Sequence, residues 1–301
     1  FAAMAAIKYI YQTASIAIKG AYCYLNCYIL FVITTAVSPS NSLFAATAYN
    51  ADTTNPQKAC IKGQYKNFFA DAMGNLFLQL PNNGIKKLNN KGDSIGLFND
   101  VRRYGNLESM DVSNPLKVIL FYKDFGEIVI LDRFLNLRNT IDLRLSGVLQ
   151  PAAVAQSYDN NYWVFDAIEY KLKKIDDKGV IAFSTADFRL LFNEAFLPQV
   201  IIDDNTKLYL YDINYGWMIF DYYGAFLQKV HAAGWIDVQV FPNTLCGRKD
   251  TCSIAYAYKT FIENKIPLPN AIGASAKLFI TASDYITLEE DGICRYPITQ
   301  Q

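Results

Sequence analysis

Short apolar runs alternate with turns along most of this chain, and the pattern begins near residue 60. Each repeating unit has an apolar strand, a turn, a second apolar strand, and then an acidic or amide residue that leads into a tight turn. Short apolar runs bounded by turn residues are typical of buried β-strands. The copies begin at residues 75–78, 117–122, 161–165, 207–211 and 277–280. The pattern therefore predicts a series of similar β-hairpins.

The turn residues recur at a regular interval. Asn89, Asp132, Asp176 and Asp221 are spaced 43, 44 and 45 residues apart. From Asp221 to the last turn, at Glu289, is 68 residues, which leaves room for two shorter units, the first at Thr244–Pro267. An acid or amide at the start of such a turn accepts hydrogen bonds from its own backbone, and a following glycine can take a positive φ. We count six units.

A period of 40-odd residues built from short strands matches the blade of a β-propeller. Sandwiches do not repeat so evenly, parallel β-helices have shorter periods, and helical solenoids need a 3.6-residue periodicity that this chain lacks. We therefore predict an all-β fold, a β-propeller of about six blades, with five to seven open, over residues 57–301. The four turn residues should occupy equivalent blade positions. One helix is predicted, at Thr185–Ala195, as an insertion between the third and fourth units.

Residues 1–56 are a different kind of sequence, rich in alanine and without the repeat. The run Ala21–Val37 is apolar and uncharged, follows Lys8 and Lys19, and precedes small residues around Ala46 and Ala48. A basic start, an apolar middle and a small-residue exit are the layout of a secretory signal. The same run is at the lower length limit for a transmembrane helix. A signal, a membrane anchor and a segment packed on a partner remain alternative interpretations.

Composition narrows the class of protein. Hydrophobic residues make up 52% of the chain, with 21 Tyr and 20 Phe, and this abundance of strand-forming residues favours sheets over helical bundles. The formal net charge is zero. Nucleic-acid binders normally carry a basic excess or stripe, so nucleic acid is not an expected partner.

The six cysteines, at positions 23, 27, 60, 246, 252 and 294, are too sparse for a disulfide-built scaffold. Cys246 and Cys252 could link a hairpin in an oxidising compartment, but small buried thiols are the favoured interpretation. Cys60 and Cys294 lie at the two ends of the proposed ring. Ring closure should bring them within roughly 20 Å of each other, closer than either is to Cys27.

Catalytic motifs are missing from the sequence. The one histidine, His231, precludes a multi-histidine metal site, and neither a nucleophile elbow nor a phosphate-binding glycine loop is present. We interpret His231 as an exposed loop residue. Acidic pairs such as Asp176/Asp177 and Asp203/Asp204 point to opposite sides of an extended chain and do not form an acid/base couple by adjacency. No cofactor or metal is predicted.

Aromatic and arginine residues are the remaining surface candidates. Trp and Arg are favoured at the centres of protein interfaces. The aromatic candidates are Trp163, Trp217, Tyr222, Tyr223 and Trp235, but at these spacings the core between blades is the favoured place for them. Our candidate partner interface is Arg102, Arg103 and Trp235, which we place on loops between blades.

Three stretches resemble known propeller families. Asp71–Leu78 resembles the core of NHL-type repeats, and Tyr162–Asp166 is similar to YWTD propellers. Asn114–Phe125, with Ile130–Arg133 and Phe220–Ala225, resembles a group of exported propeller-like proteins of Bacteroidota over residues 60–298. That resemblance implies a periplasmic or outer-membrane-associated protein without known catalysis. It carries over no site residues.

Two functional hypotheses follow. The favoured one is a non-enzymatic exported propeller that binds a protein partner as a scaffold subunit of an outer-membrane-associated assembly, such as one for protein secretion or barrel assembly. The alternative is a carbohydrate-active or lactonase-type enzyme, with carboxylates from several blades meeting at the central tunnel. Convergence of carboxylates near the axis would favour the alternative.

Overall fold

The computed structural model describes residues 59–298, apart from residues 100, 205, 270, 271, 274–276 and 282; of residues 101 and 102 it describes the backbone alone. The chain divides into two compact units, Phe1–Thr47 and Ala48–Gln301, and all the described residues belong to the second. The predicted apolar segment 1–56 lies outside them. Among the described residues, no helix is long and apolar enough to cross a membrane.

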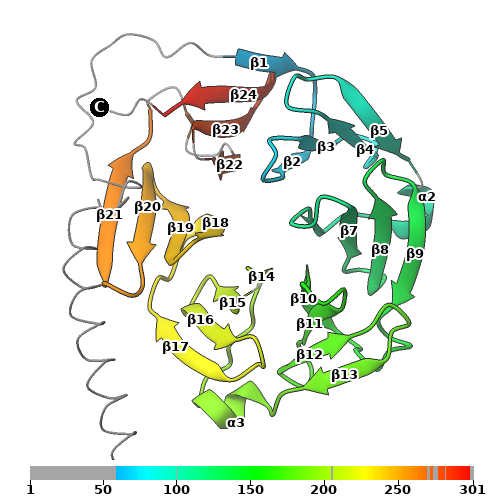
Figure 1. The fold of residues 1–301 in the computed structure, drawn as a ribbon, viewed down its shortest axis with the longest axis vertical. Helices are drawn as coiled ribbons and strands as arrows, with labels where there is room; N and C mark the ends of the chain where they lie inside the picture. The colour runs from blue at the N-terminus through cyan, green and yellow to red at the C-terminus, as the bar shows by residue number, and fades with distance from the viewer. Residues whose placement is uncertain are drawn as a thin grey trace, which may run out of the picture. The chain divides into compact units, whose positions relative to one another are not determined.

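The described residues form six antiparallel sheets of four strands, arranged around a common axis as the blades of a propeller (Figure 1). Blade 1 consists of β2 (Asn67–Ala70), β3 (Leu76–Gln79), β4 (Ile85–Leu88) and β5 (Ser94–Phe98). Blade 2 consists of β6 (Ser109–Asp111), β7 (Lys117–Tyr122), β8 (Glu127–Asp132) and β9 (Leu137–Asp142). Blade 3 consists of β10 (Pro151–Gln156), β11 (Tyr162–Asp166), β12 (Lys171–Ile175) and β13 (Ile181–Ser184). Blade 4 consists of β14 (Val200–Asp203), β15 (Lys207–Asp212), β16 (Gly216–Asp221) and β17 (Phe226–Val230). Blade 5 consists of β18 (Ile236–Phe241), β19 (Thr244–Lys249), β20 (Cys252–Ala257) and β21 (Ile262–Pro267). Blade 6 consists of β22 (Lys277–Ile280), β23 (Asp284–Glu289), β24 (Gly292–Pro297) and β1 (Ala59–Lys62). The predicted six-bladed, all-β fold is confirmed.

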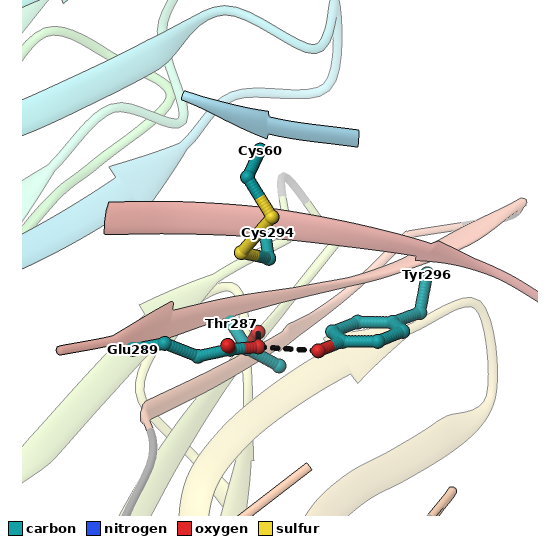
Figure 2. The surroundings of a disulfide bond; sticks show 5 residues. All are labelled: Cys60, Thr287, Glu289, Cys294 and Tyr296. Atoms are coloured by element: carbon teal, nitrogen blue, oxygen red, sulfur yellow. Dashed lines mark hydrogen bonds between the residues drawn. A yellow bond between two sulfur atoms is a disulfide. The ribbon is translucent and has the colours of Figure 1, made fainter. Parts of the chain in front are cut away.

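The two ends of the described chain share the last blade. Strand β1 pairs antiparallel with β24 and forms the outer strand of blade 6, so the N-terminal strand completes a sheet of three C-terminal strands. In this register Cys60 lies opposite Cys294, and the two form a disulfide with their Cα atoms 4.1 Å apart (Figure 2). The predicted proximity of Cys60 and Cys294 is confirmed. The comparison with Cys27 lies outside the described residues.

Each blade buries both faces of its middle strands against its neighbours. Six hydrophobic clusters result, one at each interface between blades. Several middle strands are consequently continuous apolar runs, such as Val118–Tyr122 in β7 and Trp217–Phe220 in β16, in which every residue is buried. Others, such as β4 and β12, include buried lysines. Because water reaches neither face, these strands do not show the alternating pattern of a one-sided sheet. This explains why the sequence shows the middle strands most clearly.

The predicted turn residues are structurally equivalent. Asn89, Asp132, Asp176 and Asp221 each lie at the end of the third strand of their blade. In all four, the side-chain Oδ1 accepts hydrogen bonds of 2.8–2.9 Å from the backbone N–H groups two and four residues later. These side-chain hydrogen bonds satisfy backbone N–H groups of the turn that have no partner in a neighbouring strand, as the chain turns into the outer strand.

Three sequence-based details need correction. The last copy of the repeat was placed one strand out of phase, because Lys277–Ile280 is the inner strand of blade 6 and the turn after Glu289 joins its second and third strands. The predicted helix at Thr185–Ala195 is present but shorter, α3 (Phe188–Phe192), with Asp187 as its N-cap. Arg102 and Arg103 lie in a short helix, α2 (Val101–Tyr104), rather than in a loop.

Candidate functional site

The inner strands carry carboxylates that hydrogen-bond the neighbouring blade. The Gln156 backbone N–H donates to Asp111 Oδ2 at 2.7 Å across the boundary between blades 2 and 3. The Ser157 hydroxyl donates to Asp203 at 3.1 Å across the next boundary. Within the residues described above, no group of three or more His, Cys, Asp or Glu side chains could hold a metal ion. Asp111 and Asp203 thus connect adjacent blades near the axis.

A partly buried lysine lies among the same inner strands, between blades 6 and 1. Lys277 Nζ donates to Asn67 Oδ1 at 2.6 Å and lies 4.1 Å from the centroid of the Phe69 ring. Burial lowers the pKa of Lys277 to about 8, and the negative charge of Asp237 opposes this shift without cancelling it. Among the described residues, the ammonium is therefore held by an amide oxygen and an aromatic face rather than by a close carboxylate.

Large apolar side chains are exposed along the outer rim of blades 3 and 4. We call this surface the rim patch, and its members are Leu145, Val180, Ile181, Leu190, Tyr223, Phe226 and Leu227. Leu145, Leu190 and Tyr223 are 88%, 85% and 80% exposed. Figure 1 shows that α3 lies between the outer strands β13 and β17, so the elements that carry the patch meet at one part of the rim.

Contacts between neighbouring elements bring the segments that carry the rim patch close together. The Ile181 side chain lies beside Gly147, close to Leu145 in the chain. The Phe183 ring in β13 lies against Gly224, the residue after Tyr223, and so joins blade 3 to the turn of blade 4. The Phe192 ring of α3 lies 4.8 Å from the ring of Phe226, centroid to centroid. The patch therefore extends from the loop before blade 3 to strand β17. Contiguous apolar surfaces of this kind mark sites of interaction with other molecules.

The candidate interface residues do not form one surface. Arg103 is exposed on α2, with its guanidinium 5.4 Å from the centroid of the buried Tyr104 ring. The side chain of Arg102 lies outside the described structure. Trp235 is only 4% exposed, and its ring packs so closely on Gly247 that a Cβ there would lie 2.9 Å from Cε3. The expectation that Trp235 presents its ring at an exposed interface is therefore wrong. A partner contact at Arg102 and Arg103 stays a prediction.

The other singled-out residues are divided between core and surface. Trp163 and Trp217 are buried between blades, as their spacing indicated, whereas Tyr223 is exposed. His231 is exposed, as predicted. Cys246 and Cys252 are free thiols, in agreement with the favoured interpretation, and burial raises the pKa of Cys246 to about 12. The rim patch is not among the predicted site residues. Its signal in the sequence is paired apolar residues next to the turns, as in Val180-Ile181 and Phe226-Leu227.

No protein-family model matches this chain, and no protein of curated function matches it in sequence. Solved structures do match its fold. Virginiamycin B lyase from Staphylococcus aureus, in a catalytically inactive form with quinupristin, matches with a TM-score of 0.52 and 14% identity, over 82% of this chain and 89% of the lyase.

Two further matches are of other kinds. The WD40 domain of Pan2 from Neurospora crassa has a TM-score of 0.57 and 11% identity, over 79% of this chain and 91% of that domain. A chain of the mitotic checkpoint complex has a TM-score of 0.51 and 11% identity, over 77% of each chain. At these identities the matches establish the β-propeller fold alone, because the fold is shared by an enzyme and by non-enzymatic proteins. The more specific resemblances to NHL, YWTD and Bacteroidota propellers stay predictions.

Proposed function

We propose that this chain is an exported, non-enzymatic β-propeller that binds a partner protein through the rim patch. The observation that carries the proposal is the exposure of Leu145, Tyr223 and Leu227 on elements of adjacent blades that contact one another. Scattered apolar residues are normal on a protein surface, whereas a contiguous patch is a characteristic of an interaction site.

Charges around the rim patch suggest the chemistry of the partner. Arg144 precedes Leu145 and Lys178 lies two residues before Val180, and both basic side chains are exposed. Arg144 is 3.7 Å from Asp142, a distance typical of a weak surface pair. Asp177 is also exposed, next to Lys178, so the edge of the patch carries both signs of charge. The partner surface that fits best is therefore apolar at its centre and of mixed charge at its edge, because opposite charges at the rim of an interface guide association.

The Cys60–Cys294 disulfide supports export. Disulfides persist in oxidising compartments such as the bacterial periplasm and the cell exterior, and are rare in the cytosol. We extend the proposal to a periplasmic scaffold subunit of an outer-membrane-associated assembly, for protein secretion or barrel assembly, in line with the family that the sequence resembles.

Site-specific photo-crosslinking in the producing cell tests the proposal. A photoreactive residue at Tyr223 should give one adduct of defined mass, and one at Leu97, which is 57% exposed in blade 1, should give none. Replacing Leu227→Lys should remove the Tyr223 adduct without loss of the folded structure, because an exposed substitution typically changes stability by about 0.5 kcal/mol or less.

Three results would overturn the proposal. One is equal adducts, or no adduct, from Tyr223 and Leu97. Another is an adduct of twice the mass of the chain, which would make the rim patch a contact between two copies. The third is turnover of a glycan or lactone by the purified domain, lost when Asp111→Asn or Asp203→Asn neutralises an inner-strand carboxylate.

A further inference from the structure

A cavity of about 410 Å³ lies between blades 4 and 5, on the side opposite the Asp-x-x-Gly turns. It is separate from the residues of the rim patch, and we call it the blade 4/5 pocket. Its lining residues are Glu194, Asn214, Tyr215, Lys229, His231, Ala232, Ala233, Trp235, Lys249, Ile254, Glu263 and Lys265. This volume is within the usual range of small-molecule sites, about 300–1,000 Å³.

The loop that forms one wall of the pocket is fixed from beneath by a single buried hydroxyl. Tyr211 Oη accepts a hydrogen bond from the Trp235 backbone N–H at 2.6 Å and donates to the Trp235 carbonyl at 2.8 Å. Burial raises the pKa of Tyr211 to about 12, so the hydroxyl keeps its proton at neutral pH. The Gly234 N–H also donates to the Ile213 carbonyl at 2.7 Å. The wall that carries His231 is therefore largely preformed, which lowers the entropic cost of binding a ligand.

The charges in the pocket do not balance. Lys229 is paired with Glu194, and Lys265 lies 2.8 Å from Glu263. The third lysine, Lys249, makes one long contact within the described structure, 3.4 Å from the Ala233 carbonyl. One lysine thus has no acidic partner among the lining residues, and His231 belongs to the same lining. An anion would supply the missing partner.

Apart from Asn214, the rest of the lining is apolar or aromatic. Trp235 and Ile254 are buried at its base, and Tyr215 is half-buried at its side. We propose that the blade 4/5 pocket binds a small organic anion, with its carboxylate on Lys249 and an apolar body of one ring against Trp235 and Tyr215. His231 borders the anion and adds a hydrogen-bond donor.

The test compares two probes of the same shape, phenylacetate and neutral phenylacetamide, by saturation-transfer NMR with the full chain. Phenylacetate should bind, and the affinity for phenylacetamide should be lower by a factor of about ten or more. One charge-assisted hydrogen bond contributes a difference of this order. Lys249→Met should weaken phenylacetate binding by a similar factor. Lys249→Arg should retain it, and Lys91→Met, in an exposed turn of blade 1, should leave it unchanged.

The near-ultraviolet circular dichroism of each variant shows whether its aromatic core is intact. Equal binding of phenylacetate and phenylacetamide would show a merely apolar site and overturn the proposal. So would phenylacetate binding that Lys249→Met does not change in a folded variant, or no saturation transfer from phenylacetate to the wild-type protein. None of these outcomes depends on partner binding at the rim patch.

Discussion

The fourth position of the four equivalent turns is glycine in three blades and leucine in the other. Gly92, Gly179 and Gly224 occupy it in blades 1, 3 and 4 with φ between 83° and 92°. In blade 2 the residue is Leu135, with φ 68° and its side chain buried in the cluster between blades 1 and 2. A positive φ costs a non-glycine residue roughly 1–2 kcal/mol, whereas burial of a leucine contributes about 1.5–3 kcal/mol. Burial thus offsets the backbone cost at Leu135.

We predict that Gly224→Ala destabilises the protein more than Gly92→Ala. Both glycines have a positive φ, but a Cβ at Gly92 would meet no atom within 4 Å, and one at Gly224 would lie 2.9 Å from the Phe183 ring. Gly92→Ala should cost about 1 kcal/mol for the backbone alone, and Gly224→Ala roughly 1–3 kcal/mol more for the steric conflict. Urea unfolding measures both free energies. Measured against Phe183→Ala alone, the added cost of Gly224→Ala should fall to that of Gly92→Ala. Equal costs for Gly224→Ala and Gly92→Ala in the wild-type protein would contradict the steric contact.

The depressed pKa of Lys277 predicts a pH dependence of stability. Its folded pKa is about 8 and its ordinary value 10.5, so between these values the unfolded chain binds more protons than the folded one. The contribution of this lysine to the free energy of unfolding therefore rises with pH across that window. The raised pKa values of Cys246 and Tyr211 act in the opposite direction above pH 9.

A difference between two proteins isolates the lysine. The free energy of unfolding of the wild type, minus that of Lys277→Met, should increase between about pH 7 and about pH 10, since the other titrating groups cancel. Urea unfolding at several pH values gives this difference. The difference in free energy of unfolding between the wild type and Lys91→Met should not change with pH. A flat curve for Lys277→Met would show that the amine is not desolvated in the folded protein.

At the scale of the elements, the sequence revealed strands whose two faces are both buried. The second and third strands of blades 1 to 4 can be located because they carry short apolar stretches and the third strand ends in an Asp or Asn turn. In β4 and β12 lysines interrupt the apolar stretch, so the turn is the stronger signal there. Outer strands were harder to locate, since only one face packs. Strand β1 has four residues, Ala59–Lys62, of which three are exposed, and its sequence has no strand signal of its own. Its place in blade 6 is set by pairing with β24 at the far end of the chain.

The same reasoning explains the errors at blade 6 and at the candidate site. Blades 5 and 6 lack the Asp-x-x-Gly turn after the third strand, so the motif could not fix their phase. The turn at Glu289 resembles it in sequence, because acidic residues and a glycine recur there. The rim patch depends on which side of an outer strand faces solvent. Tertiary packing of β13, β17 and α3 decides this, and local composition does not.

At the scale of the whole molecule, the ring couples distant blades. Each blade buries apolar side chains against both neighbours, and the six clusters leave no blade without a partner on either side. The disulfide in blade 6 joins residues 234 positions apart and holds the strand that completes the ring. The three tryptophans lie elsewhere, in the clusters formed by blades 3, 4 and 5. Tryptophan fluorescence can therefore report how loss of the disulfide affects blades that do not contain it.

We predict that replacing the disulfide, by Cys60→Ser with Cys294→Ala, lowers the stability of blades that do not contact it. Removal of a cross-link that closes so long a loop should lower the free energy of unfolding by about 2–5 kcal/mol. If the ring unfolds as one unit, tryptophan fluorescence and far-ultraviolet circular dichroism will shift by the same amount in urea. Cys252→Ser, at a free and partly buried thiol in blade 5, is the matched control and should shift neither transition by as much. A fluorescence transition that stays in place while the dichroism gains an early step would mean that blade 6 unfolds by itself, and that closure of the ring does not stabilise the other blades.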